Sequence, residues 1–242
     1  MLTLVFNEVL YRPIFNALIF LYNIIPGHDF GIAIILLTII IRIVLSPLTY
    51  KSIKSRYALS FLQPKIKEIQ KKFEKKEEQS KELMKLYKEN KVNPASGCLP
   101  LLIQIPILLG LYRALINILK TGSLSVLYPF IHDPGTINSM FLGILDLSKT
   151  SPVLAILAGA SQFFYSKITM KQQQMPQMSE KSGNMQKMMG KQMMYMMPII
   201  TVFIAWSFPA GLALYWFIST VLGLAQELYF SKKINGKNKA NN

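Results

Sequence analysis

Arg42 is the residue whose type and position most directly suggest chemistry in this chain of 242 residues. It lies in an apolar run from Phe30 to Tyr50, roughly 18 Å from Phe30 along a helix that rises about 1.5 Å per residue. A charge at that depth of a bilayer costs about 3 kcal/mol by insertion scales, and an acidic residue or water normally offsets the cost. The acidic residues outside the segments 51–97 and 171–192 lie at the edges of predicted helices or in predicted outer loops. We therefore expect Arg42 to face a hydrated cavity that opens to the cytoplasm. Those acidic residues are Glu8, Asp29, Asp133, Asp146 and Glu227.

A hydrated cavity with a fixed positive charge and no carboxylate suits binding of an anionic group better than proton transfer. Coulomb attraction would hold an acidic peptide segment there, and the low dielectric nearby would strengthen it. Small and hydroxyl-bearing residues at helical spacing also serve helix packing, which we expect for Ala155, Gly159 and Gly223. Arg113 lies near the outer end of its run, where its side chain can reach the interface. The polar residues predicted to line the cavity with Arg42 are Thr38, Ser46, Gln104, Gln162, Tyr215 and Ser219.

Five long apolar runs must position these residues, and they exclude a soluble globular protein. About twenty residues cross a hydrocarbon core of about 30 Å, and the runs reach this length or fall slightly short of it. A soluble domain of this size has no core large enough for five such helices. The predicted fold class is an all-α polytopic membrane protein with a core of five transmembrane helices. The runs are 30–50, 98–119, 152–170, 193–208 and 210–230.

The N-terminal segment, residues 1–26, is predicted to be an amphipathic helix that lies in the membrane interface. Glu8, Arg12 and Asn16 recur at a spacing of four residues and therefore share one helical face. The charge-free part, residues 13–25, is too short to cross a bilayer. A sixth span is the alternative.

Polar segments separate the predicted spans. Residues 51–97 are rich in Lys and Glu, with apolar residues at helical spacing, which predicts a helical hairpin in the cytoplasm. The other segments are an extracytoplasmic loop (120–151), a methionine-rich cytoplasmic loop (171–192) and a basic cytoplasmic tail (231–242).

The net charge of +15 is unevenly distributed, and this predicts an orientation. Of the 27 Lys and Arg residues, 13 lie in 51–91, five in 167–191 and four in 232–239, whereas 121–151 holds only Lys149. Loops rich in Lys and Arg stay in the cytoplasm, so the N-terminus is expected at the outer side and the C-terminus in the cytoplasm. The basic loops then face anionic lipid headgroups, with a ribosomal RNA surface as a further partner.

Enzyme and metal chemistry are not expected. The sequence contains no zinc-protease, serine-hydrolase or nucleotide-binding glycine motif. The single Cys98 and the separated His28 and His132 do not form a metal site, and no cofactor is predicted. Ten of the 13 methionines lie between Met170 and Met197. They are poor candidates for a copper(I) site, and they fit either an adaptable apolar surface or the inner end of the fourth helix.

Several short motifs, taken in order, resemble the YidC family of membrane protein insertases. The resemblance extends over roughly residues 6–232 and implies insertion of membrane proteins without nucleotide hydrolysis. It places Arg42 in a groove that is closed toward the outside and open to the cytoplasm and to lipid. It also assigns Gln162 and Trp216 to that groove. The motifs are Leu37-Thr38-Ile39-Ile40-Ile41-Arg42, Pro47-Leu48, Gln63-Pro64-Lys65-Ile66, Asn93-Pro94, Gly97-Cys98-Leu99-Pro100, Gln104-Ile105-Pro106, Phe208-Pro209-Ala210-Gly211-Leu212, Tyr215-Trp216 and Gln226.

The resemblance implies nascent membrane proteins as clients, the ribosome and the Sec translocon as further partners, and a location in the bacterial inner membrane. It corresponds to a short form without a large extracytoplasmic domain or a lipoprotein-type leader. The alternative function is a small transporter or channel for an anionic solute, which predicts a path open on both sides. A scaffold subunit is a third reading. Specific DNA binding is not expected.

Overall fold

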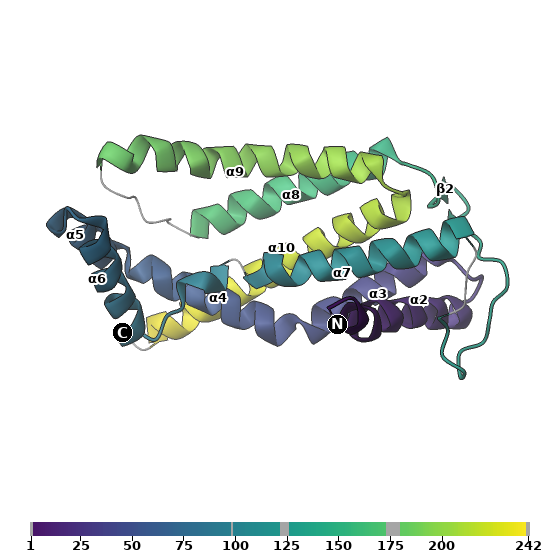
Figure 1. Cartoon of the computed structure of the whole chain (residues 1–242). Coiled ribbons are helices and arrows are strands. Elements are labelled where there is room, and N and C mark those ends of the chain that lie inside the picture. Colours follow the sequence, from purple (N-terminus) through teal and green to yellow (C-terminus); the bar gives the residue numbers. More distant parts are fainter. Residues whose placement is uncertain (1, 98, 122–125, 173–179, 241–242) are drawn as a thin grey trace. The chain divides into compact units, whose positions relative to one another are not determined.

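The computed structural model describes residues 2–97, 99–121, 126–172 and 180–240, which are mostly helical (Figure 1). The chain divides into two compact units. In chain order the elements are α1 (Leu2–Phe6), the π-helix η1 (Asn7–Tyr11), α2 (Arg12–Ile24), α3 (Phe30–Val44), α4 (Ser46–Phe61), α5 (Gln63–Lys72), α6 (Lys76–Glu89), the 3-10 helix η2 (Pro94–Gly97), α7 (Leu99–Ile116), the π-helix η3 (Asn117–Thr121), β1 (Met140–Phe141), β2 (Leu145–Asp146), α8 (Pro152–Gln172), α9 (Glu180–Ser207) and α10 (Ala210–Ala240).

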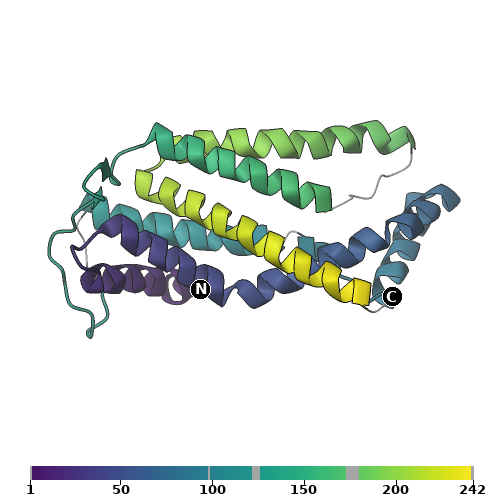
Figure 2. The same ribbon diagram turned by 180° about the vertical axis from the view of Figure 1, so that it is seen from behind.

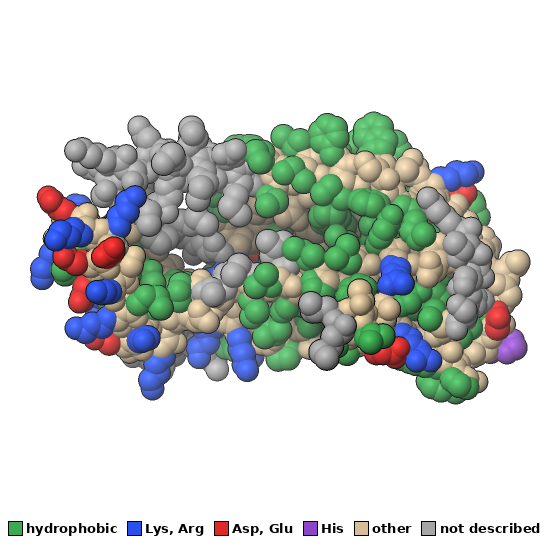
Figure 3. Space-filling view, viewed as in Figure 1, with side chains coloured by type: hydrophobic (Ala, Val, Ile, Leu, Met, Phe, Trp, Pro, Cys, Tyr) green, Lys and Arg blue, Asp and Glu red, His purple; other side chains and the backbone are tan. Residues whose placement is uncertain are grey.

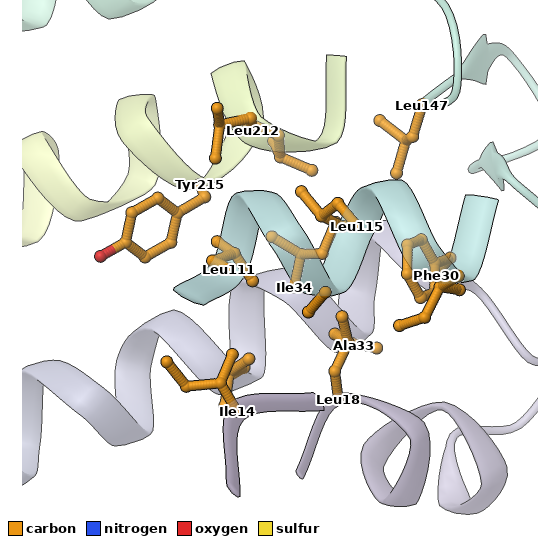
Figure 4. Close-up of a cluster of buried hydrophobic side chains, with 14 of the residues drawn as sticks. Ile14, Leu18, Phe30, Ala33, Ile34, Leu111, Leu115, Leu147, Leu212 and Tyr215 are labelled. Atoms are coloured by element: carbon orange, nitrogen blue, oxygen red, sulfur yellow. The ribbon is translucent and has the colours of Figure 1, made fainter. Parts of the chain in front are cut away.

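The first unit comprises residues 1–45, 101–162 and 198–222. Its core lies where α2, α3, α7 and the first turns of α10 meet, and α2 and α3 lie side by side in both views (Figure 1, Figure 2). Leu18, Ile34 and Leu115 are completely buried there and come from three different helices (Figure 4). On its outer side, α7 exposes Leu102, Ile105 and Leu109 at helical spacing, as expected of a helix that faces lipid. Hydrophobic side chains accordingly cover α7 in Figure 3.

The second unit comprises residues 46–100, 163–197 and 223–242. Ile53 and Tyr57 of α4 pack against Ile234 near the end of α10. Leu62, Ile66 and Leu86 form a separate small core between α5 and α6, which pack together as a helical hairpin. Lys, Arg, Asp and Glu side chains gather over this hairpin in Figure 3.

Four helices are long and apolar enough to span a membrane among the described residues, or five if α3 and α4 together form one broken span. This supports a polytopic helical membrane protein. The first span was expected to be one helix over 30–50, but it breaks at Leu45. Pro47 explains the break, because proline has no N–H for the helix ladder and its ring clashes with the preceding turn.

The N-terminal segment also differs from expectation. The helical segment Thr3–Ile24, which includes the charged Glu8 and Arg12, meets the length and composition of a span, so a sixth span stays open as the alternative. Arg12 Nη1 lies 3.2 Å from Glu8 Oε2 one turn away, and this pairing lowers the cost of both charges. A position in the interface stays a prediction.

The polar face of this segment binds a loop of the same chain. Asn16 is 2% exposed; its Nδ2 donates to the Val126 carbonyl at 3.0 Å and its Oδ1 accepts from Tyr128 N at 2.6 Å. Asn23 Nδ2 donates to the His132 carbonyl at 2.7 Å. The amphipathic pattern therefore reflects, in part, loop packing rather than contact with water.

Other boundaries shift as well. Part of the expected loop 171–192, residues 173–179, lies outside the described residues, but α9 begins at Glu180 and is already helical over 180–192. The expected fourth span, 193–208, is reduced to a shorter apolar helix, Met194–Ser207, which is not among the candidate spans of the described residues. α10 continues through the expected tail to Ala240. The loop 120–151 contains the two-stranded β1–β2 hairpin, so the fold is not purely helical.

Candidate functional site

Arg42 contacts α10 through a serine. Its guanidinium donates from Nε and Nη2 to Ser219 Oγ, at 3.1 and 2.9 Å. Arg42 is half-buried and Ser219 is 3% exposed. The hydroxyl uses both lone pairs to accept these bonds, which solvates the guanidinium without cancelling its charge.

Tyr215 extends this polar contact toward α7. Its hydroxyl accepts a hydrogen bond from Gln104 Nε2 at 2.8 Å, and it also interacts with Ser219 one turn along α10. The ring packs in the apolar core while the hydroxyl oxygen points away from it (Figure 4). Four side chains from three helices, Arg42, Ser219, Tyr215 and Gln104, thus form one connected set, which we call the polar cluster.

Small residues at the start of α10 allow the helices that carry the cluster to approach closely. A Cβ on Gly211 would meet Ile34 Cδ1 at 3.2 Å and the Leu115 methyl groups at 3.5 Å. Ala210 and Ala213 on the same turns are completely buried. This packing of α10 against α3 and α7 fixes the positions of Ser219 and Tyr215, because membrane helices with small residues at their contacts come closest.

Other predicted site residues lie outside the polar cluster. Thr38 is completely buried, and its hydroxyl donates to the Ile34 carbonyl at 2.6 Å within its own helix, so it does not line a hydrated surface. Trp216 is half-buried against the core, and Gln162 is half-buried on α8. Ser46 is the first residue of α4.

The structure also contains a buried ion pair that the sequence analysis missed. Glu227 was expected at the edge of its helix, but it is 2% exposed and forms a salt bridge with Arg56 Nη2. Arg56 is itself 7% exposed and lies in the Lys-rich segment that was expected to be solvated. Glu227 lies 171 residues further along the chain, so no local sequence pattern indicates the pair.

Arg113 has polar and aromatic neighbours. Its Nη1 donates to Asn7 Oδ1 at 2.7 Å, and its guanidinium lies 4.8 Å from the centroid of the Tyr11 ring. Its side chain is therefore accommodated by the N-terminal helical segment. The described residues hold no group of three or more His, Cys, Asp or Glu side chains that could bind a metal ion.

The fold and the site define a polytopic helical membrane protein. Its polar cluster, which contains an arginine, lies between three helices. The sequence model of the 60Kd inner membrane protein family matches residues 20–238. The chain therefore belongs to this family, which includes the YidC-type membrane protein insertases.

Curated relatives and a solved structure agree with this assignment. A protein of a Geobacter species named membrane protein insertase YidC is 38% identical over 226 residues, which is 92% of this chain and 37% of the relative. A protein of the same name from Syntrophus aciditrophicus is 38% identical over 224 residues, 91% of this chain and 36% of the relative. A crystal structure described as an active YidC insertase with its first transmembrane domain resolved is 28% identical, with a TM-score of 0.60 over 91% of this chain and 45% of that one. The chain thus spans little more than a third of the length of these curated relatives.

Proposed function

We propose that this chain is a membrane protein insertase and folding chaperone of the bacterial inner membrane. The observation that carries the proposal is the polar cluster, in which Arg42 contacts Ser219 among helices otherwise suited to lipid. The name of the relatives, membrane protein insertase YidC, supports it. The clients are nascent membrane proteins, with the ribosome and the Sec translocon as further partners.

The first step, capture of a client, depends on electrostatic attraction. A hydrophilic groove that contains the polar cluster opens to the cytoplasm and shortens the stretch of hydrocarbon that a polar segment must cross. Arg42 attracts an acidic stretch of the client, since two opposite charges about 4 Å apart attract by about 4 kcal/mol at an effective dielectric constant of about 20. Ser219 holds the guanidinium in place, and Gln104 and Tyr215 offer exchangeable hydrogen bonds to a polar backbone.

Release of the client is driven by burial in lipid. Each Å² of apolar surface removed from water contributes about 25 cal/mol, so a client helix gains most of its free energy after it leaves the groove. The membrane potential contributes about 2.3 kcal/mol per charge per 100 mV and draws an acidic segment outward. Gln162 on α8 and Trp216 on α10 mark the surface along which the client helix moves into lipid.

Photo-crosslinking of a stalled nascent client tests this function. A photoreactive residue at Gln162 or Trp216 is expected to capture the client. The control is the same residue at Phe20 of α2, which is 50% exposed and lies away from the proposed path. Absence of client adducts at both test positions, in protein that inserts clients normally, would contradict the path. An anion transporter or a scaffold subunit would show no adducts and no insertion.

A further inference from the structure

The turn of the β1–β2 hairpin exposes two large aliphatic side chains outside the predicted spans. Leu142 is 60% exposed and Ile144 is 84% exposed. Ile144 N donates to the Phe141 carbonyl at 3.0 Å, which closes a four-residue turn. Leu142 and Gly143, the central residues, have φ values of +52° and +68°. Turns of this kind favour Asn, Asp or Gly, so turn chemistry does not explain a strained, exposed leucine.

One end of a predicted membrane span holds this turn. Asp29 caps α3, because its Oδ1 accepts from Ile32 N at 2.9 Å, and its Oδ2 accepts from Leu142 N at 2.6 Å. Phe141 packs directly against Gly31 in the first turn of α3, where a Cβ would meet the ring at 2.1 Å. The turn is therefore fixed at the level where α3 begins.

The start of α10 binds the segment that directly follows β2. Gly211 N donates to the Leu147 carbonyl at 3.1 Å, and Ala210 N donates to the Lys149 carbonyl at 2.7 Å. Leu147 is completely buried in the core of the first unit. The hairpin is thus bonded to the beginnings of α3 and α10. Most of α10 is a candidate span, and α3 is the first part of the candidate broken span. The turn of the hairpin therefore lies beside the ends at which these two helices begin.

We propose that Leu142 and Ile144 form an anchor that inserts into the lipid headgroup and upper acyl-chain region, on the side of the membrane where α3 begins. Lipid is the occupant because the turn is held at the ends of α3 and α10, helices that are apolar enough to cross a membrane or to form part of a span. Two side chains also offer far less area than a stable protein interface requires. Burial in lipid gives Leu142 a physical role, since a turn with positive φ at this position would otherwise favour Asn, Asp or Gly.

Spin labelling tests the depth of the turn. Cys98 is the only cysteine, so Cys98→Ser provides a background for Ile144→Cys with a nitroxide label. The control is Thr136→Cys, an exposed polar position in the same loop. Both full-length proteins are reconstituted in vesicles of phosphatidylethanolamine and phosphatidylglycerol. The accessibility of each label to oxygen, which dissolves in lipid, is compared with its accessibility to a water-soluble nickel chelate.

The label at 144 is expected to collide more with oxygen than with nickel, and the label at 136 is expected to show the reverse. A label at 144 that is as accessible to nickel as the label at 136 would overturn the proposal. A label at 144 shielded from both reagents would also overturn it, in favour of a protein surface that covers the turn. Both positions are exposed, so labelling does not disturb the core, and retained insertion of clients verifies the fold.

Discussion

Arg56 on α4 and Glu227 on α10 form an ion pair in which the side chains are only 7% and 3% exposed. The pair lies in the second unit, where Ile53 and Tyr57 of α4 pack against Ile234 of α10. Two charges in such a site are stable only together, because each alone would lack both water and a counter-charge. The ion pair therefore ties α4, the helix that leads into the α5–α6 hairpin, to α10, the last helix of the chain.

Removing one partner of this pair is expected to destabilise the protein strongly. Glu227→Leu or Arg56→Met alone leaves one buried charge and should cost about 3–5 kcal/mol of unfolding free energy. The double variant should recover most of that loss, because apolar side chains of similar volume replace both charges. Unfolding by denaturing detergent in mixed micelles measures all three. Single variants as stable as the parent would show that the charges are solvated rather than buried.

The sequence predicted the polar cluster better than the ion pair, for physical reasons. Arg42, Tyr215 and Ser219 stand out because polar residues are expensive in an apolar helix, so depth and helical spacing alone identify them. Arg56 gave no such signal, because it lies among many lysines that are solvated. Glu227 lies at the end of an apolar run, where an acid is ordinarily exposed, and only tertiary packing buries it.

Other differences follow from contacts that are distant in sequence. The break at Leu45 has a local cause in the sequence, Pro47. The apolar run continues past this proline, however, and therefore predicted one unbroken helix. By contrast, the polar face around Asn16 gave the same pattern that a water-facing helix gives. Its burial depends on Val126 and Tyr128, more than 100 residues away. Periodicity identifies a polar face, but it does not identify what covers that face.

Charge at position 42 should determine the insertion of clients with acidic segments. Arg42→Ala is expected to slow insertion of an acidic-tailed client by about tenfold or more, because the attraction to the carboxylates is lost. Arg42→Lys should retain most of the rate, since lysine keeps the charge while changing the contact with Ser219. The measurement is insertion of a defined client into reconstituted vesicles, with protection from added protease as the readout.

A matched arginine on another helix controls for general effects of removing a charge. Arg113→Ala on α7 removes contacts with Asn7 and Tyr11 but leaves the polar cluster intact. Clients with acidic segments should still insert at close to the parent rate. If Arg42→Ala matched the parent for every client, capture by charge would be wrong.

Close packing at Gly31 should make this position intolerant of even a small side chain. The Cβ of Gly31→Ala would meet Phe141 Cδ2 at 2.1 Å, so the hairpin must move away from α3. We expect a loss of about 1–3 kcal/mol in unfolding free energy, typical of overpacking. Gly236→Ala on α10 is the matched control, because nothing lies within 4 Å of the added methyl group and alanine favours a helix. Equal stability of the two variants would show that Phe141 moves aside without cost.

Asp146 should make the β1–β2 hairpin sensitive to acid. Hydrogen bonds from the side chains of Ser148 and Ser139 hold the pKa of the Asp146 carboxyl well below its usual range. A carboxyl whose pKa is lowered by folding contributes stability that is fully present above its unfolded value of about 3.9 and is lost as the pH falls toward its folded value. The midpoint temperature of thermal unfolding of the parent should therefore decrease as the pH is lowered below about 4. In Asp146→Asn this part of the pH dependence should be absent, because the amide does not titrate. The control for the change from carboxyl to amide is Asp133→Asn in the same loop, where the Asp133 carboxylate accepts from the Gly135 N–H. Identical profiles for Asp146→Asn and the parent would show that the carboxylate does not stabilise the hairpin.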